Sequence, residues 1–187
     1  MQKKIKQLIS ELNNSITVNG QHNNISIAFS EILKQYLSNR LLRLECLKEY
    51  LNNLTLKNNN WITQPVYIND EFQYSINLIC WPIGASNSPH IHKYWTVSGV
   101  LYGHLNFSTY KYLDNISNLL TKDNEFEGYP GKVGYVLPPC IHSVTNKGQT
   151  GAISMHIFSY CNLERINISL PNDILVHNPI LKYLFIP

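Results

Sequence analysis

The hydrophobic pattern changes once along this chain, near residue 58, and the change limits the folds that the chain can adopt. Up to about residue 56, apolar residues recur at helical spacing, as Ile5, Leu8 and Leu12 do in the first segment. From Trp61 onward, short runs rich in β-branched and aromatic residues alternate with Gly, Pro and Asn turns. No strand–helix–strand alternation appears, which argues against a parallel α/β sheet. The sequence therefore predicts a mainly β protein, an all-β sandwich or barrel, with an α-helical N-terminal section.

The length of 187 residues suits a single structural domain. Within it, residues 1–57 are predicted to form the helical section packed on the barrel, and residues 58–187 the barrel with a C-terminal tail. Residues 112–131 are predicted to be a loop between the two halves of the barrel, and the residues from Pro171 onward an irregular tail.

The composition limits the partners of this protein. A net charge of +3, with no Lys/Arg cluster interleaved with aromatic residues, argues against nucleic-acid binding. No stretch is long enough to span a bilayer, and the first segment lacks the unbroken apolar run of a signal peptide. The cysteines, which are scattered without a C-x-x-C pair, are expected to be reduced thiols. We expect a cytoplasmic protein with a small-molecule partner, and both a monomer and a homodimer fit the sequence.

Two histidines one residue apart, His90 and His92, follow a proline in the segment "SPHIHKYW". Side chains alternate across a strand, so both imidazoles lie on one face and can reach the same metal ion. An isolated H-x-H is weak support, because such pairs more often face solvent. The surrounding spacing strengthens it: Gly84 lies six positions before His90, Thr96 four after His92, and Gly103 seven after Thr96.

A second segment, "GKVGYVLPPCIHSVTN", completes the pattern. It supplies Gly131, Pro138, His142 and Asn146, with Pro139 where the usual pattern has glycine. The two segments together resemble the two motifs of the cupins, with Thr96 in place of the usual glutamate ligand. The resemblance implies a double-stranded β-helix, also called a jelly-roll barrel, and a metal site formed by His90, His92 and His142.

Such a site has a defined chemistry. Three neutral imidazoles leave a divalent metal its full charge and about three open positions, which favours an anionic ligand such as a thiolate or carboxylate. Imidazole suits iron, copper, nickel and zinc alike, so the ligands do not identify the metal. A three-histidine zinc hydratase therefore stays open on ligand type.

Residues 61–170 further resemble the thiol dioxygenases, the cysteine dioxygenase-like branch of the cupins. The matching stretches are "FQYSINLICWPIGASNSPHIHKYWTVSGVLYGHL", "PPCIHSVTN" and "ISMHIFS". The resemblance implies that the histidines hold ferrous iron, Fe(II), and that both atoms of O2 are added to the sulfur of a small thiol carboxylic acid. The product is a sulfinic acid, and the substrate of such an enzyme is 3-mercaptopropionate or cysteine.

Within this branch, Trp95 and Gly99 resemble the bacterial 3-mercaptopropionate dioxygenase type. Val97 stands where the mammalian cysteine enzyme has a cysteine that crosslinks to tyrosine, so that crosslink cannot form. Gln64 corresponds to a glutamine of the mercaptopropionate type, and Arg165 to its carboxylate-binding arginine with a gap of two residues. An arginine fork suits a carboxylate, although Arg165 is equally compatible with a surface position.

The segment "SMHIF" departs from the family pattern S-x-H-x-Y. Ser154 and His156 resemble the residues that orient substrate and oxygen, whereas Phe158 replaces the tyrosine and lacks its hydroxyl. Another donor, Tyr102 or Tyr94, is predicted to take its place, and Trp95 is predicted to contact the substrate.

Two alternatives remain at this point. A three-histidine iron oxygenase of a specialised biosynthetic pathway, acting on an amino acid or an amine, fits the loss of the tyrosine. A non-catalytic cupin that binds a metal or a small ligand fits it as well.

Overall fold

A computed structural model describes residues 3–19, 22–51, 62–113, 119–159, 166–167 and 184–186. Its helices come first in the chain: α1 (Lys3–Asn19), α2 (His22–Ser38) and α3 (Arg40–Leu51). The strands that follow are β1 (Ile62–Asn69), β2 (Tyr74–Trp81), β3 (His90–Ile91), β4 (Thr96–Tyr102), β5 (Leu105–Tyr112), β6 (Leu120–Gly128), β7 (Val133–Val136), β8 (Ile141–Thr145), β9 (Ala152–Ser159), β10 (Ile166–Asn167) and β11 (Leu184–Ile186). The predicted mainly β architecture with a helical N-terminal section is confirmed.

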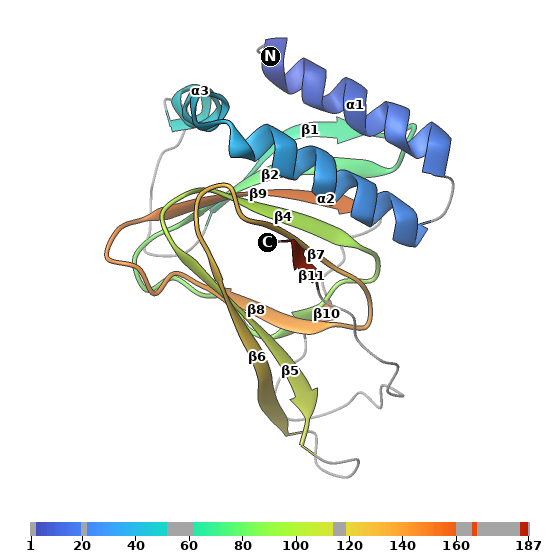
Figure 1. Cartoon of the computed structure of the whole chain (residues 1–187). Coiled ribbons are helices and arrows are strands. Elements are labelled where there is room, and N and C mark those ends of the chain that lie inside the picture. The colour runs from blue at the N-terminus through green and yellow to red at the C-terminus, as the bar shows by residue number, and fades with distance from the viewer. Residues whose placement is uncertain are drawn as a thin grey trace.

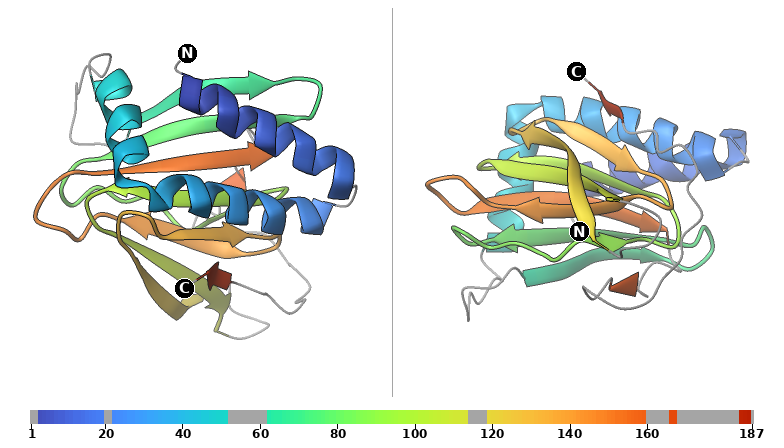
Figure 2. Two further views of the ribbon diagram at one scale, coloured as in Figure 1. Left: turned by 45° about the horizontal axis from the view of Figure 1, so that its top comes forward. Right: turned by 90° about the horizontal axis from the view of Figure 1, so that it is seen from below.

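The strands form two antiparallel sheets that face each other. One sheet has the order β1-β2-β9-β4-β7-β11 and the other the order β10-β3-β8-β5-β6. The helices lie across the outer face of the first sheet, as Figures 1 and 2 show. Strands that are distant in the chain therefore lie side by side, because β4 pairs with both β7 and β9. No helix of the described residues is long and apolar enough to cross a membrane.

Strand β4 is covered on both of its faces. Val97 and Leu101 point toward the helices and join the core that α2 and the first sheet share. Gly99, between them, allows a close approach, because a Cβ at this position would collide with Cδ1 of Leu37 on α2. The alternate residues of β4 point to the space between the sheets, where Val100 joins a second core.

The second core lies inside the barrel and contains apolar side chains from both sheets. Its buried members are Ile79, Trp81, Val100, Leu105, Val144, Ala152 and Phe158. These side chains fill one part of the space between the sheets and leave a cavity beside them.

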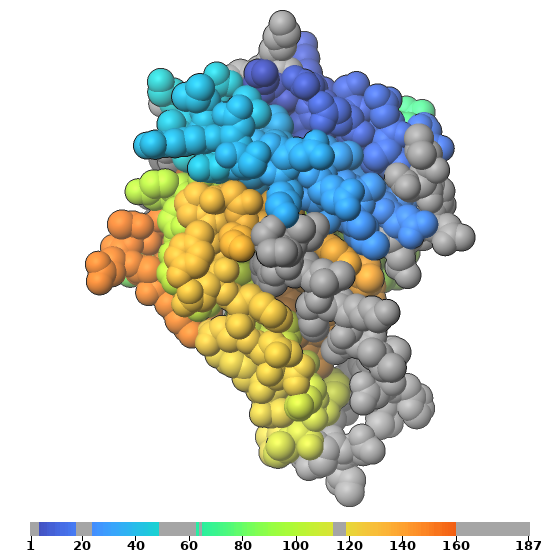
Figure 3. All heavy atoms as spheres, viewed as in Figure 1, coloured from blue at the N-terminus to red at the C-terminus, as the bar shows by residue number. Residues whose placement is uncertain are grey.

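The prediction of a loop over residues 112–131 is wrong. Strand β6 lies within that range and pairs with β5 from Leu105↔Gly128 to Tyr112↔Leu120. The sequence concealed this strand because most of its side chains are charged or polar and exposed, as is common for an edge strand. In Figure 3, β5 and β6 extend to the end of the molecule opposite the helices.

The predicted irregular tail is also partly wrong, because Leu184–Ile186 pairs with β7 as β11. The rest of the segment from Pro171 lies outside the described residues. On α3, the apolar repeat marks the buried face incompletely: Leu47 is buried, but Leu41 and Leu44 are exposed.

The loops that carry the two histidine segments are joined by direct hydrogen bonds. The backbone N of Gly84 donates to the carbonyl oxygen of Asn146 at 3.1 Å, and the N of Asn146 donates to the carbonyl oxygen of Ala85 at 2.9 Å. Gly84 has a φ of 75°, in the left-handed region that favours glycine. The glycine of the first segment and the asparagine of the second therefore act together to close the barrel beside the histidines.

The side chain of Asn146 is fully buried and ties this junction together. Its Nδ2 donates to the carbonyl oxygens of Trp81 at 2.8 Å and Thr150 at 2.9 Å, and its Oδ1 accepts from the N of Gly148 at 2.9 Å. We expect Asn146→Ala to lower the free energy of unfolding by about 1–3 kcal/mol, because buried carbonyl groups lose their donor. Urea denaturation measures this effect. The exposed Asn124→Ala is the control, and equal stability of the two variants would contradict the expectation.

Candidate metal centre

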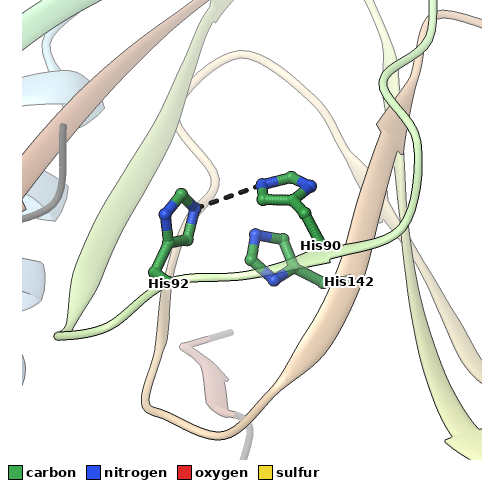
Figure 4. Close-up of side chains that lie close together, drawn as sticks. All are labelled: His90, His92 and His142. Atoms are coloured by element: carbon green, nitrogen blue, oxygen red, sulfur yellow. Dashed lines mark hydrogen bonds between the residues drawn. The ribbon is translucent and has the colours of Figure 1, made fainter. Parts of the chain in front are cut away.

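The imidazoles of His90, His92 and His142 converge in the space between the sheets (Figure 4). Their exposed fractions are 3%, 3% and 8%. The ring nitrogens that could act as ligands all lie within 4.8 Å of one another, and Nε2 of His90 is 3.3 Å from Nε2 of His92. Among the described residues, this is the group of His, Cys, Asp and Glu side chains that could hold a metal ion.

Strand pairing places these histidines. His90 lies directly opposite His142 in the pairing of β3 with β8, and their ring centroids are 4.4 Å apart. His92 follows the short strand β3, and its ring centroid is 4.9 Å from that of His142. One ligand thus comes from the second segment, 50 or more positions along the chain, and the antiparallel register brings it beside the first pair.

The second ring nitrogens of two of these histidines are held by backbone carbonyls. Nδ1 of His90 donates to the carbonyl oxygen of Ser88 at 2.9 Å, and Nδ1 of His142 donates to that of Cys140 at 3.3 Å. A neutral imidazole that donates through Nδ1 keeps a lone pair on Nε2. Backbone carbonyls commonly orient metal-binding histidines in this way. Nitrogens about 2.0–2.1 Å from one metal lie at most about 4.2 Å apart, so small rotations of these rings, whose ligand nitrogens lie within 4.8 Å of one another, would bring all three to a single ion.

The histidines line a cavity of about 40 Å³ between the sheets. Most of its wall is apolar, and aromatic or aliphatic side chains such as Ile79, Phe107, Phe126, Val144 and Phe158 contribute to it. No described residue that lines the cavity is an Asp, Glu, Lys or Arg. Thr96, at the position of the usual cupin glutamate, lines the cavity with a hydroxyl instead of a carboxylate.

The residues predicted to surround the metal on β9 share one face. Ser154, His156 and Phe158 alternate along the strand, and His156 and Phe158 line the cavity. The ring of Phe158 stacks on that of His156 and lies 5.5 Å from that of His92 between centroids. Ser154 Oγ lies 2.8 Å from Nε2 of His156 and accepts a hydrogen bond from Nε1 of Trp81, also at 2.8 Å.

Two of the predicted substrate contacts are not found at the cavity. Trp95 is buried against α2, where its ring meets that of Phe29 edge-on at 5.2 Å between centroids. Tyr102 is 48% exposed at the end of β4 and does not line the cavity. Residues on one face of β4 pack on the helices, and residues on the other face line the inside of the barrel. Alternation alone does not predict which of the two faces points to the cavity.

Of the two residues predicted to bind a carboxylate, the structure describes only the backbone of Gln64. The backbone of Gln64 lies in β1 opposite Leu78, and its side chain lies outside the described residues. Arg165 also lies outside the described residues.

Ser98, which neither histidine motif marks, also lines the cavity and places its Oγ 2.8 Å from Nδ1 of His156. A signal was present, because Ser98 lies two positions after Thr96 and must share its face of the strand. The spacing of the glycines and histidines in the two segments does not include position 98, so this spacing alone does not indicate Ser98.

Comparisons with known proteins show the fold. An oxalate oxidase in complex with the substrate analogue glycolate matches with a TM-score of 0.50 and 21% identity, over 62% of this chain and 58% of that chain. Another oxalate oxidase structure matches with a TM-score of 0.49 and 20% identity, over the same shares of the two chains. A cupin superfamily protein from Desulfitobacterium hafniense has a TM-score of 0.45 and 18% identity, over 58% of this chain and 84% of that chain.

The match thus spans less than two thirds of the oxalate oxidase chain, and at this identity the likeness concerns the fold alone. A scan of protein-family models and a search of curated proteins each find no match. The chain has the cupin fold, as expected, with a candidate metal site of three histidines.

Proposed function

We propose that this protein is an Fe(II)-dependent dioxygenase that oxidises the sulfur of a small thiol carboxylic acid, 3-mercaptopropionate or cysteine, to a sulfinic acid. The observation that carries this proposal is the set of three buried imidazoles at the wall of a mainly apolar cavity, with no carboxylate among the described lining residues. When bound, iron supplies open coordination positions and the redox chemistry needed to join dioxygen to a thiolate sulfur.

The charge of the site supports an anionic substrate. His90, His92 and His142 are neutral ligands, and no described residue that lines the cavity carries a carboxylate. A divalent cation held by them is therefore uncompensated, and in an apolar cavity this charge strongly favours a thiolate over a thiol. Arg165 and Gln64 are proposed to bind the carboxylate at the other end of the substrate.

The cavity wall serves the same chemistry by limiting water. Phe107, Val144 and Phe158 surround the space beside the histidines, and a drier site strengthens every electrostatic contact in it. Ser154 keeps His156 in one orientation through its hydrogen bond to Nε2. His156 lines the cavity and holds Ser98 Oγ at 2.8 Å from its Nδ1, and it is proposed to orient substrate and oxygen together with that hydroxyl.

Oxygen consumption tests the proposal. One thiol and one dioxygen give one sulfinic acid, so we expect equal amounts of oxygen uptake and sulfinate when the iron-loaded protein receives 3-mercaptopropionate or cysteine. An oxygen electrode and mass spectrometry of the product measure the two quantities. The His142→Ala variant treated with iron in the same way should consume no oxygen above background. If neither thiol draws down oxygen with the iron-loaded protein, the proposal is refuted.

A second candidate is a three-histidine iron oxygenase that acts on an amino acid or an amine. The ring of Phe158, which offers no hydroxyl beside His92, favours this candidate. The amine fits further, because no described lining residue is a lysine or arginine that could bind a carboxylate. A screen of amino acids, amines and thiols by mass change separates the candidates. Two oxygens added to sulfur indicate the first, and any other change indicates the second. Ligand binding without turnover of any compound would instead indicate a non-catalytic cupin.

A further inference from the structure

A chain of hydrogen bonds crosses the inner face of the first sheet from Trp81 to Ser98. Nε1 of Trp81 donates to Ser154 Oγ, which lies 2.8 Å from Nε2 of His156, and Nδ1 of His156 lies 2.8 Å from Ser98 Oγ. The register supports this chain, because Ser98 pairs with His156 directly across β4 and β9.

The direction of these hydrogen bonds follows from the donors available. An indole N–H can only donate, so the oxygen of Ser154 accepts from Trp81. Ser154 is fully buried, and its own proton needs an acceptor. Among the described residues, the acceptor within reach is Nε2 of His156. In a neutral imidazole the other nitrogen then carries the proton, so Nδ1 of His156 donates to Ser98 Oγ.

This assignment leaves the hydroxyl proton of Ser98 available for a further hydrogen bond. Ser98 lines the cavity, and so does Thr96, two positions earlier on the same face of β4. Thr96 is only 2% exposed, and its Oγ1 has no hydrogen-bond partner among the described residues. A buried hydroxyl without a partner destabilises the folded protein, so a group that enters the cavity gains by pairing with it.

We propose that Thr96 and Ser98 form a hydrogen-bond-donating subsite for a small anion whose other end is bound at the three-histidine site. This inference deepens the proposed function, because it assigns a donor in a cavity where Phe158 supplies none. It rests on the metal site and not on the thiol chemistry. The three histidines and the two hydroxyls line one cavity of about 40 Å³, so a small anion can contact both sets.

Azide binding to the whole 187-residue chain loaded with cobalt(II) tests this subsite, with visible absorption as the readout. We expect Ser98→Ala to raise the Kd for azide about tenfold or more, because a hydrogen bond to a charged ligand is lost. Thr96→Val should weaken azide binding in the same direction, and Ser98→Thr should restore it toward the wild-type value. Cobalt binding itself should be unchanged in all three variants.

Ser108→Ala is the matched control. Ser108 also lines the cavity, but it is on β5 and its hydroxyl is directed to Glu125 at 3.5 Å. We expect its Kd for azide to stay within about twofold of the wild type. A purely structural role of Ser98 would lower the Tm and leave the azide affinity of the folded protein unchanged, which would overturn the proposal. If Ser98→Ala does not fold, an unchanged azide affinity in Thr96→Val overturns it.

The absence of any azide-dependent change in cobalt-loaded wild-type protein would overturn the subsite as well. The two proposals can fail separately. Azide binding that depends on Ser98, without oxygen uptake from any thiol, refutes the thiol dioxygenase and supports the subsite. Thiol oxidation together with azide binding that is insensitive to Ser98 and Thr96 supports the dioxygenase and refutes the subsite.

Discussion

Replacing His142 with alanine is expected to weaken the binding of a divalent metal by at least about 100-fold. Loss of a residue that only hydrogen-bonds to a metal ligand weakens metal binding by up to about 100-fold, and loss of a ligand itself should cost at least as much. The imidazole of His142 lies opposite His90 and is fixed by the carbonyl oxygen of Cys140. Its loss leaves two histidines on one short segment, and no described carboxylate lines the cavity to replace it.

Metal content after dialysis and calorimetric titration with iron(II) or cobalt(II) measure this loss. A second readout is thermal stability, because a metal at about 100 times its Kd stabilises the folded protein by about 2.7 kcal/mol. His104→Ala is the control: this histidine stacks on Tyr129 with ring centroids 4.5 Å apart and belongs to no metal group among the described residues. If His142→Ala and His104→Ala bind metal equally well, the three-histidine site is wrong.

Replacing Phe29 with alanine is expected to lower the free energy of unfolding by about 3–5 kcal/mol. Phe29 is on α2 with an exposed fraction of 0%, and its ring meets those of Tyr74 and Trp95 edge-on at 5.4 and 5.2 Å between centroids. Removing the ring leaves a cavity between the helix and the first sheet. Such a loss is a large part of the stability of a typical domain, which is about 5–15 kcal/mol.

Urea denaturation followed by circular dichroism and tryptophan fluorescence measures this effect. Because Phe29 joins the helix to Tyr74 on β2, we expect both signals to change in one transition at a lower urea concentration. Ile27→Ala, on the same helix but 41% exposed, is the control and should change the stability by less than about 1 kcal/mol. A loss below about 1 kcal/mol for Phe29→Ala would show that the helices contribute little to the barrel.

Strand β6 shows where local patterns fail. Hydrophobic alternation finds a strand only when one of its faces is buried, and β6 is an edge strand whose charged side chains are mostly exposed. Hydrogen bonds to β5, not its own residues, make it a strand. For strand β4 the alternation is uninformative for the opposite reason, because both faces are buried: helices cover one face and the second sheet lies over the other. Its sequence "TVSGVLY" therefore does not distinguish the residues that face the cavity from those that face α2.

The sequence by itself determined the change from helices to strands and the identity of the three histidines. The change from helices to strands depends on the local period of apolar residues, whereas the three histidines were identified from the spacing of two segments that resemble the cupin motifs. Only the tertiary structure decided what surrounds them. The pairing of β4 with β9 brings Ser98 to His156 across 58 positions of the chain, and Trp95 packs on Phe29 of α2. The register between distant strands and the layers packed on each face govern these contacts, and no short stretch of sequence contains that information.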